Sequence, residues 1–449
     1  MATKRLEFIN VSDPSDAKAA SIRTKVRKHV MKDIGRARRR PKKGPITFEL
    51  ILNPQCQLGS REIDPFVRFP IEMGKTEKSL LSMIFRDVDC TQYAHRYEWF
   101  SVALLDEATM LLVLSNSAAH RDRASGLPLG QKSPDASELY LRALASVNRR
   151  LLEPKPEISD GLVGAIAGLM THNDIVGNFE EWTLHVHGLE QLLDMRGGIS
   201  TISTRELKDT ILYIELRGAF YQDIVPRFPL SVTWIPYMTV EDGYHGTLES
   251  SDLILQWKLE HPTHTVWPHI YKDLVHYSLL TQEESTLTSG RSWLESTHGG
   301  NWPNAQIHRI TSWRPLQDTL FANSAAIKEE FLRLASLFYL GILWAKFGVL
   351  PLGTAIYSEK LYELHRRYPL SWGELWPFAA WCLLVGAVGS SGERRQYFFE
   401  EIWALCLRDG VSVDKALRKA KGVMWVEDAF EDVDIYREMT RDMTVVQLE

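Results

Sequence analysis

Apolar residues that recur every three or four positions constrain the fold of this chain more than any other feature of its sequence. From Lys78 onward this helical spacing returns repeatedly, and we find no convincing alternating run, βαβ rhythm or internal repeat. Amphipathic helices without strands must bury their apolar stripes on one another. The sequence therefore predicts an all-α fold, either a large helical bundle or a layered α-domain.

The predicted helices fill most of the chain after residue 78. Their expected ranges are 78–87, 92–119, 135–152, 159–175, 179–196, 204–222, 248–259, 265–280, 325–347, 353–367, 371–388, 394–408 and 412–436. The stretches 120–134, 223–247 and 281–324 have the composition of loops. Helices 325–347 and 371–388 are apolar on most sides, which indicates either a central position or an oligomer seam.

Two of these helices show how the pattern is interpreted. Helix 135–152 carries an apolar stripe made of Leu139, Leu141, Leu144, Val147 and Leu151. In helix 179–196 the apolar positions are Trp182, Val186, Leu189 and Leu193. Arg196 suits the negative C-terminal end of this helix and can bond its last carbonyls, while Gly197 and Gly198 supply the left-handed residue that ends it. We interpret these three residues as a structural helix stop.

Cysteine usage and hydropathy limit the class of protein. The four cysteines, Cys56, Cys90, Cys382 and Cys406, are far apart, which excludes a Cys-x-x-Cys knuckle and fits a reducing compartment. The N-terminal residues lack the apolar core of a secretory signal, and the longest apolar stretches are charged or too short to span a bilayer. We expect no association with a membrane.

Charge is segregated along the chain. Residues 1–43 contain 14 Lys and Arg against 4 acids, a balance of +10, while the other 406 residues balance at −15. We therefore predict a basic N-terminal arm, residues 1–45, ahead of one α-helical domain, residues 46–449. The most basic tract of the arm consists of Arg36, Arg38, Arg39, Arg40, Lys42 and Lys43.

This tract has three interpretations. Short Lys- and Arg-rich runs act as nuclear-import signals, and they also attract the phosphates of nucleic acids. Such DNA contact through residues 1–45 would be weak and independent of base sequence. The alternative is a solvated basic tail with no dedicated partner.

The usual catalytic motifs are missing from the sequence. It contains no phosphate-binding loop, no Gly-x-Gly-x-x-Gly after a strand and no His-Glu-x-x-His. The pairs Asp87-Val88-Asp89 and Asp432-Val433-Asp434 are spaced by two residues and so cannot share a helical face as a Mg²⁺ site requires. We predict no catalytic residue, no cofactor and no metal ion.

Among the side chains that could bind a metal ion, the histidines are the strongest candidates in this sequence. His185 and His187 point to different faces of a helix, and His172 could meet His185 only if two helices pack antiparallel. The run from His261 to His264, with His269 and His276 behind it, matches no standard zinc spacing. We expect hydrogen-bonded, neutral histidines at these positions.

The segment from Trp182 to Ile199 contains His185-x-x-Gly188-Leu189 and closes on Arg196-Gly197-Gly198. With these motifs, several segments of the chain resemble the fungal-specific transcription factor domain that forms the C-terminal part of zinc binuclear cluster regulators. The segment Trp182–Ile199, with its His-x-x-Gly-Leu and closing Arg-Gly-Gly, is similar to a helix end of that family. Residues 8–31 resemble the opening of one subgroup, and 381–392 and 398–405 resemble its late helices. The resemblance implies a helical, effector-sensing and dimerising domain.

The chain departs from that family at its N-terminus. Full regulators of the family place six cysteines in a cluster whose helix enters the major groove, but the first 55 residues here contain none. We therefore expect a nuclear, transcription-regulator-like protein that does not read bases with a zinc cluster. Its expected partners are other regulatory proteins or a second copy of the chain, together with an apolar small molecule between its helices.

A second hypothesis belongs to a different class. The same helical scaffold could serve as an enzyme or ligand-binding protein of a fungal secondary-metabolite pathway, since one fold hosts unrelated functions. Three of the fourteen tryptophans, Trp293, Trp302 and Trp313, could line an apolar cavity, or they could simply anchor a long surface loop.

Overall fold

The computed structural model describes residues 69–86, 100, 102–234, 248–288, 297–316, 323–346 and 354–430. The chain divides into two units, Met1–Pro65 and Phe66–Glu449, and all of the described residues belong to the second. Within these residues every regular element is a helix, which confirms the predicted all-α fold. None of the helices described is long and apolar enough to cross a membrane.

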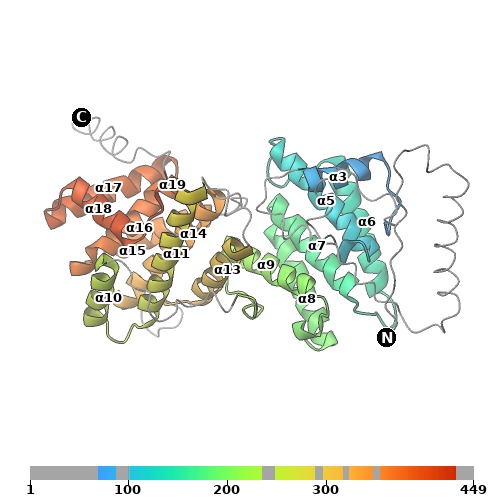
Figure 1. Cartoon of the computed structure of the whole chain (residues 1–449), viewed down its shortest axis with the longest axis horizontal. Coiled ribbons are helices and arrows are strands. Elements are labelled where there is room, and N and C mark those ends of the chain that lie inside the picture. Colours follow the sequence, from blue (N-terminus) through green and yellow to red (C-terminus); the bar gives the residue numbers. More distant parts are fainter. Residues whose placement is uncertain are drawn as a thin grey trace, which may run out of the picture. The chain divides into compact units, whose positions relative to one another are not determined.

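The first group of helices is arranged around α5 and α7 (Figure 1). The group consists of α3 (Lys75–Arg86), α5 (Glu107–Ala124), α6 (Pro134–Leu151), α7 (Asp160–Val176), α8 (Phe179–Arg196) and α9 (Arg205–Gln222). Helix α5 packs against α6 and α7, and α7 in turn packs against α8 and α9. As a result, α7 is buried from Leu162 to Val176 at every position except Thr171.

The second group of helices surrounds α14 and α16. It consists of α10 (Leu248–Glu260), α11 (Val266–Thr288), α13 (Thr297–Ser312), α14 (Ser324–Lys346), α15 (Ala355–Arg367), α16 (Trp376–Gly389), α17 (Gly392–Asp409), α18 (Val413–Val423) and α19 (Glu427–Phe430). Helix α16 packs against α14, α17 and α18, and each of its residues from Pro377 to Ala387 is buried. The chain's own helices therefore cover this apolar helix, for which the sequence allows either a central position or an oligomer seam.

Local sequence explains where the helices of the first group begin and end. The Ser133 hydroxyl accepts the backbone N–H of Ala136 at the start of α6, and Pro134 stands at the first position, where its missing N–H costs nothing. Asn178 caps α8 in the same way by accepting the N–H of Glu181. Gly177, with φ of 75°, ends α7 in the left-handed conformation that glycine adopts most easily.

One expected loop contains a helix. The sequence predicts that 281–324 is irregular, but α11 continues to Thr288 and α13 occupies Thr297–Ser312. Gly299, Gly300 and Pro303 make this segment look irregular in the sequence, because glycine and proline have the lowest helix propensities. Burial of Ala305, Ile307 and Ile310, where α13 contacts α9 and α14, overrides that propensity.

Other boundaries differ from the prediction by shorter lengths. The helix expected over 92–119 does not run through residue 106: α5 begins at Glu107 and continues to Ala124, because the Asp106 side chain caps the N–H of Thr109. The helix expected over 412–436 breaks after Val423 and resumes for one turn as α19. The start predicted at 371 is a 3-10 turn, Gly373–Leu375, and the α-helix follows it.

Tryptophan side chains fill the core of both groups. Trp182, Trp257, Trp267 and Trp381 are fully buried. Helix α9 approaches the Trp182 ring closely at Gly218, where an added Cβ would lie only 2.0 Å from an indole carbon. Any larger residue at this position would therefore push α9 away from α8.

A buried ionic cluster joins the end of α9 to the second group of helices. Asp223 stands directly after α9 in the left-handed conformation, with φ of 48°, and its side chain is 1% exposed. Its carboxylate accepts two hydrogen bonds from Arg333 of α14, at 2.7 and 3.0 Å. Arg314 and Lys360 also donate to it, at 2.7 and 2.5 Å. Burial alone raises the pKa of Asp223, but the Arg333 hydrogen bonds and the charges of Arg333 and Arg314 outweigh it and hold that pKa at about 2.

We predict that Asp223→Ala lowers the free energy of unfolding by about 3–5 kcal/mol, because it removes the acid that pairs with the buried Arg314 and leaves the buried Arg333 with Glu330 as its remaining acid. Urea denaturation followed by helical circular dichroism measures this change. The matched control is Lys360→Ala, which removes a half-exposed partner of the same carboxylate and should cost about 0–1 kcal/mol. Equal midpoints for the two variants would contradict the central role of Asp223.

Candidate functional site

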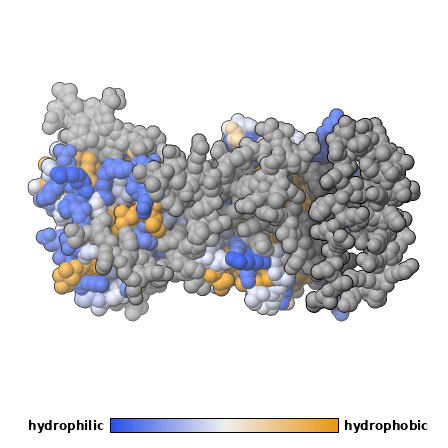
Figure 2. All heavy atoms as spheres, in the orientation of Figure 1, coloured by the Kyte–Doolittle hydropathy of each residue, from blue (hydrophilic) through white to orange (hydrophobic). Residues whose placement is uncertain are grey.

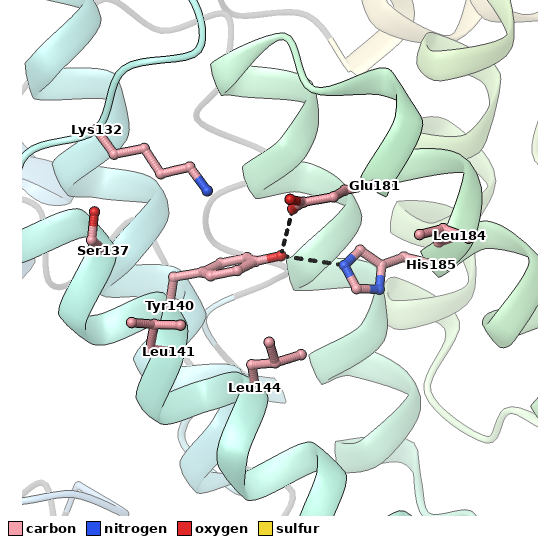
Figure 3. Close-up of a pocket in the computed structure, with 8 residues that line it drawn as sticks. All are labelled: Lys132, Ser137, Tyr140, Leu141, Leu144, Glu181, Leu184 and His185. Atoms are coloured by element: carbon pink, nitrogen blue, oxygen red, sulfur yellow. Dashed lines mark hydrogen bonds between the residues drawn. The ribbon is translucent and has the colours of Figure 1, made fainter.

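A pocket of about 470 Å³ lies between α6 and α8 (Figure 3). It is lined by Lys132, Ser137, Tyr140, Leu141, Leu144, Glu181, Leu184 and His185. The residues from α6 follow one another at steps of three, one and three, and those from α8 at steps of three and one. Side chains with such spacing share one helical face, so each helix presents one continuous wall to the pocket.

The hydroxyl of Tyr140 is the centre of the polar groups in the pocket. It donates to Glu181 Oε2 at 3.2 Å and lies 3.3 Å from His185 Nε2, and Asn173 Nδ2 donates to it at 3.4 Å. Burial raises the pKa of Tyr140 to about 12, so the phenol is neutral at physiological pH. Burial also lowers the pKa of His185, against the opposing charge of Glu181.

The hydrogen-bonding capacities of Tyr140, Glu181 and His185 determine where the protons lie among them. A neutral phenol has one proton, and the carboxylate of Glu181 can only accept it. His185 Nε2 must then carry a proton and donate it to the phenol oxygen, which leaves Nδ1 of the same ring as an acceptor. The open atoms of Glu181 and His185 that face away from Tyr140 are therefore acceptors.

His172 supports the ring of Tyr140 from α7. The two ring centroids are 4.5 Å apart, and His172 Nδ1 lies within hydrogen-bond distance of Ser115 Oγ and Asn116 Oδ1. Burial, with the nearby charges of Lys132 and His120, lowers the pKa of His172 to about 3. His172 and His185 thus both contact Tyr140, and they are linked through the phenol rather than through a shared ion.

His187 occupies a different environment from its neighbour His185. Its Nε2 lies 3.1 Å from Arg227 Nη2, and the same guanidinium pairs with Glu190 at 3.1 Å. The backbone N–H of Arg227 donates to the buried carboxylate of Glu215 at 2.8 Å. This arrangement fixes the loop after α9 against α8.

The second histidine group also has protein partners. His261 Nε2 lies 3.3 Å from the ammonium of Lys328, and His264 Nδ1 lies 2.7 Å from a carboxylate oxygen of Glu329. His269 is exposed. Among the described residues, no three His, Cys, Asp or Glu side chains are placed to hold a metal ion.

The predicted helix stop lies at the end of α8. Gly197 and Gly198 have φ of 104° and 97°, and the N–H of Gly198 donates to the carbonyl of Leu193 at 2.7 Å. The bond that the sequence suggests between Arg196 and the last carbonyls of its own helix does not form. The Arg196 guanidinium instead donates to the Thr201 carbonyl at 2.9 Å and pairs with Asp160 of α7 at 2.5 Å.

Most of the remaining residues that the sequence singles out lie outside the part of the chain that the structure describes. Arg36, Arg38, Arg39, Arg40, Lys42 and Lys43 lie outside the described residues, as do both Asp-x-Asp pairs. Of the three spaced tryptophans, Trp293 also lies outside them, and Trp302 belongs to α13. Trp313 stacks on the buried Trp267, with ring centroids 6.4 Å apart, so it packs against the core.

The pocket is hard to recognise in the sequence because Leu141 fits the apolar stripe of α6. Leu141 is in fact 61% exposed, and Tyr140 is the buried residue instead. Leu139 and Leu141 are two residues apart, so only one of them can face the core. The signal in the sequence that could have revealed it is Leu184, which lies off the apolar stripe of α8 and beside Glu181 and His185.

The comparison with known families gives one match. Residues 81–277 match the model of the fungal specific transcription factor domain. The matched region contains the segment 182–199 and the whole pocket between α6 and α8, whereas residues 8–31, 381–392 and 398–405 lie outside it. No curated protein and no solved structure matches the chain.

We predict that the stability of the protein falls between pH 4.5 and 7 because of Glu215. Burial raises the pKa of this carboxyl to about 7, against about 4.3 in an unfolded chain. The folded state therefore holds the proton over a range in which the unfolded state has released it, and stability declines as pH rises. Glu215→Gln should remove this decline, so its stability relative to wild type should rise by roughly 2–4 kcal/mol from pH 4.5 to 8.

Urea denaturation at a series of pH values measures the difference between wild type and Glu215→Gln. The glutamine amide keeps an oxygen that can accept the Arg227 N–H, so the loop contact survives the change. The exposed Glu180→Gln variant controls for the removal of one carboxylate. Parallel stability curves for wild type and Glu215→Gln would show that Glu215 does not titrate in this range.

Proposed function

Because residues 81–277 form a fungal specific transcription factor domain, we propose that the chain is a transcription-regulator-like protein of the nucleus. It acts through contact with other proteins, which are either other regulators or a second copy of the chain. The family match is the observation that carries this proposal. The basic tract of residues 36–43 supports the nuclear location, because runs of this kind serve as import signals.

We propose that these 449 residues act without a zinc binuclear cluster among them. A binuclear cluster needs six cysteines close together, and this sequence holds four that are widely separated. The basic arm adds only an attraction to phosphate that is independent of sequence.

Exposed apolar side chains on α10 support the proposed contact with proteins. Leu255 and Leu259 lie one turn apart on this helix and are 59% and 68% exposed. Figure 2 shows an apolar patch on the surface where α10 lies in Figure 1. Apolar side chains gathered in this way are typical of surfaces that bind other proteins.

The pocket between α6 and α8 supports the sensing of a small ligand. Its volume of about 470 Å³ falls in the range of small-molecule sites, roughly 300–1,000 Å³. Its exposed lining is mostly apolar, and two of its polar side chains, Glu181 and His185, meet at the Tyr140 hydroxyl, which is the usual composition of a ligand site. The pocket also lies wholly inside the matched family region.

We predict that replacing Arg38, Arg39 and Arg40 by alanine abolishes nuclear accumulation of the full chain, because the change removes half of the six positive charges of the tract. Fluorescence microscopy of a tagged chain in a fungal cell measures the ratio of nuclear to cytoplasmic signal. The control replaces three exposed arginines of the helical domain, Arg366, Arg367 and Arg408. Import that persists without the three tract arginines would contradict this role of the arm.

We also predict that any binding of the chain to DNA depends on salt and not on base sequence. Each phosphate that a bound protein neutralises contributes about −0.9 to the slope of log K against log salt concentration. The triple alanine variant at Arg38, Arg39 and Arg40 should therefore reduce the steepness of that slope by up to about 3. Fluorescence anisotropy with two unrelated duplexes measures the effect, and a marked preference for one of them would contradict it.

A further inference from the structure

Two opposite charges face each other across the pocket between α6 and α8. The Lys132 ammonium and the Glu181 carboxylate reach from opposite sides toward the space above the Tyr140 hydroxyl (Figure 3). Among the described residues, neither of them forms an ion pair with the other or with a third group. We propose that the pocket binds an apolar α-amino acid as a zwitterion, an inference that rests on the proposed function because it names the ligand that the regulator senses.

The ammonium group of the ligand fits the side of the pocket formed by α8. The Tyr140 hydroxyl already donates its proton to Glu181 Oε2, and His185 donates to the phenol oxygen. The other carboxylate oxygen of Glu181 is then a free acceptor that carries negative charge. A ligand ammonium satisfies it with a charge-assisted hydrogen bond, whereas a ligand carboxylate at this position would meet repulsion.

The carboxylate of the ligand fits the opposite side of the pocket. Lys132 Nζ lies 4.5 Å from the centroid of the Tyr140 ring, so the ammonium is held over the aromatic face and presents its remaining N–H groups to the pocket. Ser137, which also lines the pocket, adds a hydroxyl that can donate to the same carboxylate. The two charged groups of an α-amino acid thus meet two charges of opposite sign.

The side chain of the ligand fits the apolar wall. Leu141, Leu144 and Leu184 line the pocket, and Leu141 and Leu184 are 61% and 67% exposed. Covering these leucines with an aliphatic or aromatic side chain removes apolar surface from water on both molecules. A polar amino acid would place its side chain against the same leucines without a partner for its hydrogen-bonding groups.

The proposal predicts a difference in affinity among three ligands that share one hydrocarbon chain. L-Leucine carries both charges, 4-methylpentanoate lacks the amine, and 3-methylbutylamine lacks the carboxylate. Isothermal titration calorimetry of the full chain should show L-leucine binding about tenfold or more tightly than either analogue, since removing one charge-assisted hydrogen bond weakens binding by that much. L-Serine should bind more weakly than L-leucine because it gains nothing from the apolar wall.

Two variants, each replacing one charged side chain of the pocket by a neutral one, test which residue binds each charged group of the ligand. Glu181→Gln should remove the preference for L-leucine over 4-methylpentanoate, because the ligand ammonium then has no anionic partner. Lys132→Met should remove the preference for L-leucine over 3-methylbutylamine, because the ligand carboxylate then has no cationic partner. The exposed residues Glu180 and Lys155, changed to Gln and Met, are the matched controls and should retain both preferences.

The ligand site and the proposed nuclear function can fail independently, because different experiments test them. Equal binding of the three ligands, or no binding of any of them to the wild-type chain, overturns the amino-acid site even if a variant fails to fold. Variants that leave both preferences intact overturn the assignment of the charges. Nuclear import through the arm is measured in a different experiment, so failure of the ligand site leaves that result standing, and failure of import leaves the calorimetry standing.

Discussion

Most of this structure depends on the ion pairs that one buried carboxylate, that of Asp223, forms with three basic side chains. Asp223 ends α9 and receives Arg314, Arg333 and Lys360, which come from three places later in the chain. Taking these charges out of water is costly, and the hydrogen bonds among them, together with those from Arg333 to Glu330, compensate for the cost. A second contact at the same place, from the Tyr357 hydroxyl to the Phe220 carbonyl, joins α15 to the last turn of α9. The position of α9 relative to α13, α14 and α15 is therefore set by polar geometry as well as by apolar packing.

Helix existence is predictable from the sequence because apolar spacing and caps act locally. Ser133 with Pro134, and Gly177 and Gly197, mark helix ends that can be recognised without any tertiary information. Helix α13 is not predictable in this way, since Gly299, Gly300 and Pro303 argue locally against a helix and only the burial of Ile307 and Ile310 argues for it. The break between α18 and α19 is tertiary too, because the Trp381 indole donates to the Met424 carbonyl within that break.

The pocket shows the same division between local and tertiary information. The spacing of Glu181 and His185 places them on one face of α8, which the sequence reveals. Their meeting with Tyr140 depends on how α6 and α8 lie across α7, which no spacing within one helix encodes. The Asp223 cluster is a stronger case, because its basic members lie 91 to 137 residues after Asp223 in the chain. Local patterns therefore reveal helices and their ends, whereas the pocket and the Asp223 cluster, where polar side chains from several helices converge, emerge only from the tertiary structure.

The contact between Trp182 of α8 and Gly218 of α9 lies between the pocket and the Asp223 cluster. Glu181 and Trp182 are adjacent on α8, with Glu181 facing the pocket and Trp182 buried against Gly218 of α9. The indole fills the space that a Cβ at Gly218 would need, so a shift of α8 across this contact has to be accommodated by α9. Five residues further on, α9 ends at Asp223. The ligand proposed for the pocket, by holding α6 and α8 together, would act on α9, the helix that Asp223 follows, and through it on the helices later in the chain.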